Sequence, residues 1–189
     1  MAKILLVGPV GAGKSSFFNS VNSLFRGNMT SQAICGSAGT SLTNQFRTFT
    51  LKSGKGGKPI PLILCDTMGL EDEPGAGLNI DDIVNINKGH IKDRYQAFHE
   101  LVLLTKVDAA CPLVAEDLQN LYSSHYIQRK VQEISVHLGV PVNSVLPVKN
   151  YNQEVDLDQN TDILLLSALD QMLNYADSFF ENQLEDEKP

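Results

Sequence analysis

Short apolar runs separated by polar or glycine-rich segments divide this chain into alternating strands and helices. Residues 4–7 and 61–65 are continuously apolar, which is typical of strands buried in a sheet. Residues 101–108 predict a further buried strand that ends in the sequence TKVD. Residues 45–51 alternate between apolar and polar positions, as a half-buried strand does, and the glycine-rich run 53–59 predicts a hairpin turn. The first half of the chain therefore reads mainly as strands.

Helical spacing of apolar residues appears in three segments. A helix is predicted to begin at Ser16, directly behind the first strand. A second is predicted over 115–138, with Gly139 and Pro141 as stop signals. A closing amphipathic helix is predicted over 161–180.

Residues 142–148 predict a short last strand between the second and third helices. Pro147 cannot donate a ladder hydrogen bond, so this strand is expected at a sheet edge. The alternation of strands and helices predicts an α/β fold: a three-layer, Ras-like domain with a mostly parallel sheet. The chain of 189 residues fits one such domain over residues 1–182, followed by a solvated acidic tail over 183–189.

The segment that joins the first strand to the first helix carries the clearest chemistry. Residues 8–15 read GPVGAGKS, the phosphate-loop pattern GxxxxGK[ST]. Its glycines let successive N–H groups point at phosphate oxygens, at the positive end of the helix dipole. Lys14 is expected to reach the β- and γ-phosphates of a nucleotide, and the alternative is a glycine-rich structural turn. The predicted phosphate-contacting residues are Gly8, Pro9, Val10, Gly11, Ala12, Gly13, Lys14, Ser15 and Ser16.

The TKVD sequence indicates which base is read. The Asp108 carboxylate can accept hydrogen bonds from N1–H and the 2-amino group of guanine. Adenine offers neither donor, so the carboxylate would be left unpaired against it. Lys106 would lie along the base and brace the phosphate loop; the alternative is a strand that simply ends in a polar turn. The predicted base-contacting residues are Thr105, Lys106, Asp108, Lys149 and Asn150.

Metal ligands are expected around the hairpin. Residues 66–69 follow an apolar strand and read DTMG, an instance of DxxG. Asp66 would hold Mg²⁺ through water, and the Gly69 N–H would bond the γ-phosphate. A threonine before the hairpin should supply a second Mg²⁺ hydroxyl beside Ser15. Thr43 fits best.

Thr40 and Ser41 remain alternatives to Thr43 as this hydroxyl ligand. The metal ligands are thus predicted as Ser15, Thr43 and Asp66, and the catalytic candidates as Lys14 and Thr43. Leu70 stands after DxxG, where a water-orienting Gln often lies, so hydrolysis is expected to be slow or absent.

Composition excludes several classes of partner. The formal net charge is −7 and the isoelectric point is near 5, so nucleic acid is not expected as a partner. The three cysteines, Cys35, Cys65 and Cys111, lack metal or redox spacing, which favours a reducing, cytoplasmic location. No apolar run approaches the length of a membrane span, and neither end carries a lipidation pattern, so no membrane anchor is expected.

Four segments together carry a resemblance: KILLVGPVGAGKSSFFNSVNSLFRG, LCDTMGLEDEPGAGLNIDDI, LLTKVD and ILLLSALDQML. They resemble the interferon-induced protein 44-like family of GTP-binding proteins. The resemblance implies a cytoplasmic, interferon-inducible protein of antiviral defence that binds GTP with Mg²⁺ and acts through a protein effector. Family members tend to carry a TLDc-like region before the G domain. Met1 stands just before the first strand, so that region is expected to be absent.

The chain departs from the family pattern between DxxG and TKVD. The 31 residues from 70 to 100 contain no apolar strand, although the family has a further strand and helix here. The fourth strand and third helix of the domain are therefore expected to be missing. If the flanking strands closed up, Asp108 would shift by about 4.8 Å toward the phosphates. If they stayed apart, two inner edges would lack partners; either arrangement predicts a weakened domain.

Three functions follow from these observations. The favoured one is a GTP-binding protein with slow or no hydrolysis. The first alternative is a non-binding interaction or regulatory fragment, because the deletion cripples the domain. An ATP-dependent small-molecule kinase is less favoured, since it should carry an arginine-rich lid. The four arginines are scattered at Arg26, Arg47, Arg94 and Arg129.

Overall fold

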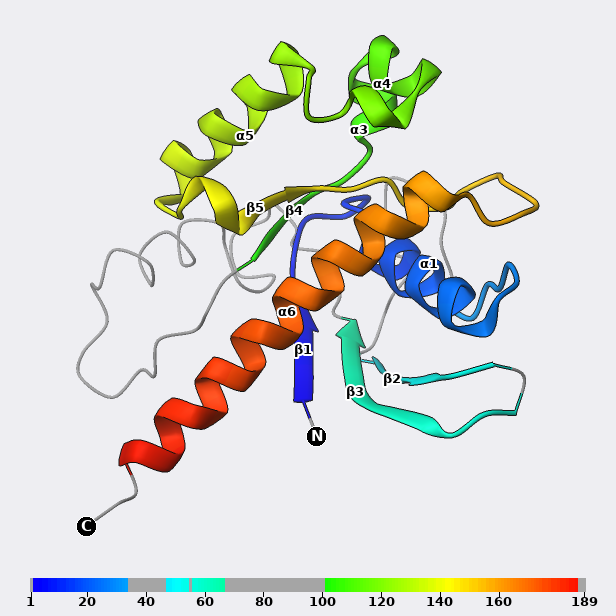
Figure 1. The fold of residues 1–189 in the computed structure, drawn as a ribbon, viewed down its shortest axis with the longest axis vertical. Coiled ribbons are helices and arrows are strands. Elements are labelled where there is room, and N and C mark those ends of the chain that lie inside the picture. The colour runs from blue at the N-terminus through cyan, green and yellow to red at the C-terminus, as the bar shows by residue number, and fades with distance from the viewer. Residues whose placement is uncertain (1, 34–46, 55, 67–100, 187–189) are drawn as a thin grey trace.

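The computed structural model describes residues 2–33, 47–54, 56–66 and 101–186 (Figure 1). The elements in chain order are β1 (Ala2–Leu6), α1 (Lys14–Arg26), β2 (Arg47–Lys52), β3 (Pro59–Asp66), β4 (Val102–Leu104), α3 (Val107–Ala110), α4 (Pro112–Glu116), η1 (Leu118–Asn120), α5 (His125–Leu138), η2 (Val142–Ser144), β5 (Val145–Pro147) and α6 (Gln159–Asp186). An α/β fold with parallel strand pairing is confirmed.

The described strands form two sheets. One has the order β1-β3-β2, in which β1 runs parallel and β2 antiparallel to β3. The other is the parallel pair β4-β5, in register from Val102–Val145 to Leu104–Pro147. Among the described strands, β1 pairs with β3 alone and β4 with β5 alone. This is the arrangement expected when the two inner strands do not close up.

One hydrophobic core joins both sheets. Phe18 of α1 stacks on Phe49 of β2, with ring centroids 4.1 Å apart. Leu165 of α6 belongs to the same buried cluster, against which Ile4 of β1 and Leu103 of β4 also pack. Figure 1 shows the long helix α6 crossing over β1. A shared core therefore holds the two sheets together without strand pairing between them.

The opposite side of β1 is less well covered. Leu5 is 54% exposed and Val7, just beyond the strand, is 37% exposed. Their neighbours Ile4 and Leu6 turn toward the core, as alternation along a strand requires. Leu5 lies within β1 and Val7 directly after it, so this side of β1 is less covered than the side that faces the core.

The prediction of one helix over 115–138 is wrong, because the segment breaks twice. Asp117 has an extended backbone (φ −148°), and its carboxylate accepts a hydrogen bond from the N–H of Gln119 at 2.9 Å. Ser124 then caps α5, its hydroxyl accepting from the N–H of Ile127 at 3.4 Å. These polar side chains satisfy free N–H groups at new helix starts, which outweighs the continuous apolar spacing.

Two predicted strands are shorter than expected. The buried strand over 101–108 is wrong in extent: β4 has three residues, all half-buried, and α3 begins at Val107. The strand over 142–148 is replaced at its start by the 3-10 turn η2, and β5 covers Val145–Pro147. Pro147 does lie on an edge strand of its described sheet, as its missing donor requires.

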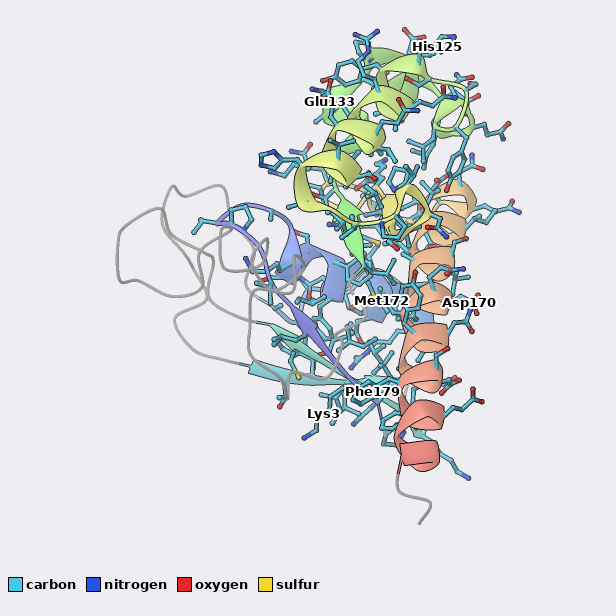
Figure 2. All side chains as sticks on the ribbon, turned by 90° about the vertical axis from the view of Figure 1, so that its left-hand side faces the viewer. Lys3, His125, Glu133, Asp170, Met172 and Phe179 are labelled. Carbon is cyan, nitrogen blue, oxygen red and sulfur yellow. The ribbon has the colours of Figure 1, made fainter. Side chains whose placement is uncertain are left out.

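Helix α6 is longer than predicted, because it runs from Gln159 to Asp186 and includes the first residues of the expected acidic tail. Met172 lies buried on its inner side, and Asp170 points away from the core (Figure 2). None of the helices in the described part of the chain combines the length and apolar character needed to cross a bilayer.

The segment that follows α1 is fastened to that helix by a buried amide. Asn19 Oδ1 accepts hydrogen bonds from the N–H groups of Gln32 (2.9 Å) and Ala33 (2.8 Å). Its Nδ2 donates to the Ala33 carbonyl at 2.9 Å. Ser23, one turn further on, accepts from the Thr30 N–H at 2.8 Å. Residues 30–33 are thereby held along the helix that carries the phosphate loop.

We expect Asn19→Ala to lower the free energy of unfolding by about 1–3 kcal/mol, because a buried donor loses its acceptor. Urea unfolding monitored by circular dichroism measures this loss. Asn174→Ala is the matched control, since Asn174 is exposed on α6 and its side-chain amide donates to Asp170 on the same helix. It should stay within about 0.5 kcal/mol of wild type. Equal midpoints for both variants would contradict the role given to Asn19.

Candidate functional site

The phosphate loop curls through two glycines before α1 begins. Gly11 has φ +76° and Gly13 has φ +89°, a left-handed conformation that favours glycine. Lys14 opens the helix, and its ammonium donates to the carbonyls of Gly8 (2.7 Å) and Pro9 (3.0 Å). The cation is therefore held over the loop, at the N-terminal end of the 13-residue helix.

The TKVD loop contacts the phosphate loop directly. The hydroxyl of Thr105 donates to the carbonyl of Ala12 at 2.8 Å, although the two residues lie 93 positions apart. Thr105 thus braces the phosphate loop, whereas the Lys106 side chain is exposed and its role along the base stays a prediction. Lys106 has φ +59° and is the one non-glycine residue of the described chain in the left-handed region. Such strain is characteristic of functional loops.

A third loop, directly after β5, also contacts the phosphate loop. The Asn150 amide Nδ2 donates to the Gly13 carbonyl at 3.2 Å. A Cβ on Gly13 would lie 2.9 Å from this Nδ2 and 3.7 Å from the Thr105 hydroxyl. Gly13 is therefore needed both for its backbone conformation and for the close approach of Asn150. The structure brings all three predicted loops together.

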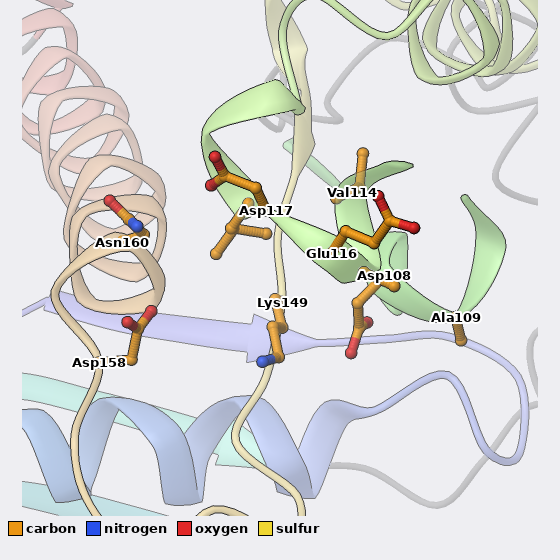
Figure 3. Close-up of a pocket in the computed structure, with 10 residues that line it drawn as sticks. Asp108, Ala109, Val114, Glu116, Asp117, Lys149, Asp158 and Asn160 are labelled. Carbon is orange, nitrogen blue, oxygen red and sulfur yellow. The ribbon is translucent and has the colours of Figure 1, made fainter. Parts of the chain in front are cut away.

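A cavity of about 370 Å³ opens beside these loops (Figure 3). Asp108 and Lys149, two of the predicted base-contacting residues, line it from different elements. Figure 3 shows both side chains among the residues that line the cavity. The remaining polar wall comes from Glu116, Asp117, Asp158 and Asn160. The cavity therefore presents several carboxylates and one lysine.

Sequence patterns gave no indication of the residues that support the third loop. The Tyr151 N–H donates to the Ser20 hydroxyl of α1 at 2.8 Å. The Tyr151 hydroxyl accepts from the Asp158 N–H (2.7 Å) and donates to Asp162 Oδ1 (2.8 Å), and burial raises the pKa of this phenol above its usual range. The loop is thus tied to both α1 and the start of α6.

Asp158 caps α6, and this role could have been predicted from the sequence. Its Oδ2 accepts from the N–H (2.8 Å) and hydroxyl (2.9 Å) of Thr161, and these bonds lower the pKa of the carboxyl. An Asp three residues before a Thr at a helix start is a capping signal. No comparable signal marks Glu154, whose carboxylate pairs with Lys149 at 2.8 Å.

Only some of the predicted metal ligands belong to the residues that the structure describes. Ser15 lies in the first turn of α1. Asp66 ends β3, and its backbone alone is described. Thr43 and its alternatives Thr40 and Ser41 lie outside the described residues, as do Gly69 and Leu70. Within the described ranges, no group of three or more His, Cys, Asp or Glu side chains is placed to hold a metal ion.

The described residues fit a nucleotide. Asn150 Oδ1 is buried, and in the described part of the chain it has no hydrogen-bond partner, a condition that a donor-bearing ligand relieves. A Cβ on Gly13 would collide with the Asn150 amide, so a glycine here keeps Asn150 against the phosphate loop. The oxygen donors of Ser15, Thr43 and Asp66 suit Mg²⁺, which prefers hard oxygen ligands.

The family to which the chain belongs follows from comparison with known proteins. The family model described as 50S ribosome-binding GTPase matches residues 3–145. The chain belongs to this GTPase family. The matched residues include the phosphate loop and the TKVD loop, and they form a P-loop GTPase domain. The alternative interpretation of residues 8–15 as a merely structural glycine-rich turn is therefore disfavoured.

The resemblance to the interferon-induced protein 44 family is also confirmed. The chain is 38% identical to human interferon-induced protein 44-like, over 95% of this chain and 52% of that protein. It is 35% identical to human interferon-induced protein 44, over 95% and 53% of the two chains. Identity to the mouse interferon-induced protein 44 is 30%, over 95% and 56%.

These relatives are longer than this chain within the matched region as well as outside it. The chain spans about half the length of the curated relatives it matches. Each alignment is 237 positions long, whereas this chain has 189 residues, so at least 48 positions hold a residue of the relative alone. Residues are therefore missing from this chain relative to the matched part of its relatives.

Proposed function

We propose that this chain binds a guanine nucleotide together with Mg²⁺ and turns it over slowly or not at all. The observation that carries the proposal is the hydrogen bond from Thr105 to Ala12, which joins the base-reading loop to the phosphate loop. Asn150 joins the third loop to Gly13 in the same way. A nucleotide needs these loops at a fixed separation, because its phosphates and base are covalently linked.

Each end of the nucleotide has a chemical partner. Lys14 and the N-terminal N–H groups of α1 supply positive charge for the β- and γ-phosphates. Asp108, half-buried in the cavity wall, supplies the carboxylate that accepts from N1–H and the 2-amino group. A carboxylate in this position discriminates against adenine, since adenine would leave it unpaired.

Mg²⁺ would be held by Ser15, Thr43 and Asp66, and it neutralises charge on the β- and γ-phosphate oxygens when bound. Leu70 follows the DxxG sequence and has no group that orients a water molecule. Hydrolysis without a partner should therefore be slow. This chain's contribution is binding and orientation of the nucleotide.

The biological setting is proposed from the relatives. Their names describe interferon-induced proteins, and on that basis we place this chain in the interferon-induced, antiviral response, acting in the cytoplasm through a protein effector. The thiols of Cys65 and Cys111 are free and buried. Free thiols suit a reducing compartment.

A second candidate is a non-binding interaction or regulatory fragment. Two observations favour it: β1 and β4 lie in separate described sheets, and at least 48 aligned positions have no residue in this chain. An unpaired inner edge weakens the domain that must hold the loops. The small-molecule kinase is disfavoured, because TKVD reads guanine and the arginines are scattered.

Titration of the purified chain with fluorescent GTP and ATP analogues in Mg²⁺, with a thermal melt in each, separates the candidates. The proposed function predicts saturable binding of GTP, at least tenfold weaker binding of ATP and a higher melting temperature in GTP. Preference for ATP would indicate a kinase. A cooperative melt that neither nucleotide shifts would support the non-binding fragment.

Turnover provides a separate prediction. We expect single-turnover hydrolysis of GTP at or below roughly 10⁻⁴–10⁻³ s⁻¹, the range of unassisted small GTPases. Release of phosphate from radiolabelled GTP measures it, with Lys14→Ala as the background. Turnover near one per second without a partner would contradict the slow-hydrolysis proposal and require a catalytic residue beyond those named here.

A further inference from the structure

Lys149 occupies an unusual position for a lysine, because carboxylates surround it. It lines the cavity together with Asp108, Glu116, Asp117 and Asp158. Its side chain is 21% exposed, so most of the side chain is withdrawn from water. A cation so placed either neutralises one of the cavity carboxylates or is held by another partner.

That partner is Glu154, which lies outside the cavity wall. Glu154 Oε1 accepts from the Lys149 ammonium at 2.8 Å, and its side chain is 30% exposed. Its other oxygen, Oε2, accepts from the N–H groups of Asn152 (2.7 Å) and Gln153 (3.0 Å). Both oxygens of Glu154 are therefore used, and the turn of the loop fixes the carboxylate in place.

The ion pair is robust to pH. Burial alone would raise the pKa of Glu154, but the bond from Lys149 and those from the loop N–H groups outweigh burial and lower it to about 2. The pair then contributes stability above the ordinary pKa of a glutamate and loses it as pH falls toward 2. Glu154 stays ionised throughout the neutral range, so Lys149 is held there at any physiological pH.

The consequence for Asp108 is that its carboxylate stays available. Within the described residues, no ion pair joins Lys149 to Asp108, although both line one cavity (Figure 3). An ammonium bound to Asp108 would use the lone pairs that the base must reach. Glu154 removes this competition, while Lys149 still lines the cavity.

We propose that Lys149 donates a hydrogen bond to the 6-oxo group of guanine and that Glu154 is the positioning residue that holds it there. The inference rests on the proposed function, because it concerns how the same cavity chooses its base. Guanine presents an acceptor at position 6 next to the N1–H that Asp108 reads. Adenine presents an amino group at position 6. Both this group and the Lys149 ammonium are hydrogen-bond donors, so no hydrogen bond can form between them. Two charged residues of opposite sign then read adjacent groups of one base edge.

The test uses the full chain with GTP, 6-thioguanosine triphosphate and inosine triphosphate in competition binding at neutral pH. The thio analogue keeps N1–H and the 2-amino group but replaces the 6-oxygen by sulfur, a weaker acceptor. Inosine keeps the 6-oxo group and lacks the 2-amino group. We expect wild type to prefer GTP over the thio analogue about tenfold or more, as loss of a bond to a charged donor implies.

Lys149→Met should reduce that preference to about threefold or less, while the preference for GTP over the inosine nucleotide, which reports on Asp108, persists. Glu154→Gln should change the thio preference in the same direction, and it should add nothing in the Lys149→Met background. Asp156→Asn is the matched control, because Asp156 is an exposed carboxylate in the same loop. It should leave every ratio unchanged.

The outcomes separate this inference from the proposed function. Failure of wild type to bind GTP would overturn both. GTP binding with an unaltered thio preference in Lys149→Met and Glu154→Gln would overturn the inference alone. Equal weakening of all three nucleotides by Glu154→Gln would show a structural role and also overturn it. If Glu154→Gln does not fold in a thermal melt, Glu154→Asp, which keeps the charge but shortens its reach, is measured in its place.

Discussion

Lys14→Ala is expected to lower the affinity for GTP by at least about 100-fold. The ammonium lies over the phosphate loop, 2.7 Å from the Gly8 carbonyl and 3.0 Å from the Pro9 carbonyl. A charge-assisted hydrogen bond contributes about 1.5–3 kcal/mol, and Lys14 would make such bonds to both the β- and the γ-phosphate. Loss of both corresponds to two or more factors of ten. Titration with a fluorescent GTP analogue measures the change.

The effect should be confined to nucleotides that carry these phosphates. GMP binding, followed by ligand-observed NMR, should change less than about threefold, because GMP lacks the groups that Lys14 reaches. Lys58→Ala is the matched control, because it removes the same charge from an exposed position in the hairpin before β3. A thermal melt checks that the loop, which Lys14 also fastens, still folds. Unchanged GTP affinity in Lys14→Ala would remove the central claim.

Asp108→Asn is expected to change the preferred base from guanine to xanthine. Asp108 is the second residue of α3, two positions after the strained Lys106, and it lines the cavity. The amide NH2 of an asparagine in its place can donate a hydrogen bond to the 2-oxo group of xanthine. It cannot bond to the 2-amino group of guanine, because both groups are donors. We expect the ratio of GTP to XTP affinity to fall by at least about 100-fold, because buried unpaired donors are strongly disfavoured.

Competition between GTP and XTP for a fluorescent nucleotide measures this ratio. Glu116→Gln provides the control, because it removes the same charge from the wall of the same cavity. Glu116 does not belong to the TKVD sequence. It should leave the ratio within about threefold of wild type. If wild type already binds ATP and GTP within a few-fold of each other, TKVD does not read guanine in this chain.

Several features were predictable because they depend on neighbouring residues alone. The strand, glycine-rich turn and helix around Lys14 follow from apolar periodicity and from the need for glycine at positive φ. The break at Asp117 and the start of α5 at Ser124 carried capping signals that apolar spacing obscured. Thr43, Gly69 and Leu70 lie outside the described residues, so their roles stay predictions.

The sequence by itself thus determined the order of elements, the P-loop GTPase family and the chemistry that each loop offers. The tertiary structure alone decided how these parts meet. The bonds from Thr105 to Ala12 and from Asn150 to Gly13 join residues 93 and 137 positions apart, and the division into two described sheets depends on equally distant pairings. Local patterns contain no information on such contacts, because their geometry is set by the packing of α1 and α6 on one core. The pairing of Lys149 with Glu154 is near in sequence but depends on a turn that no pattern marked.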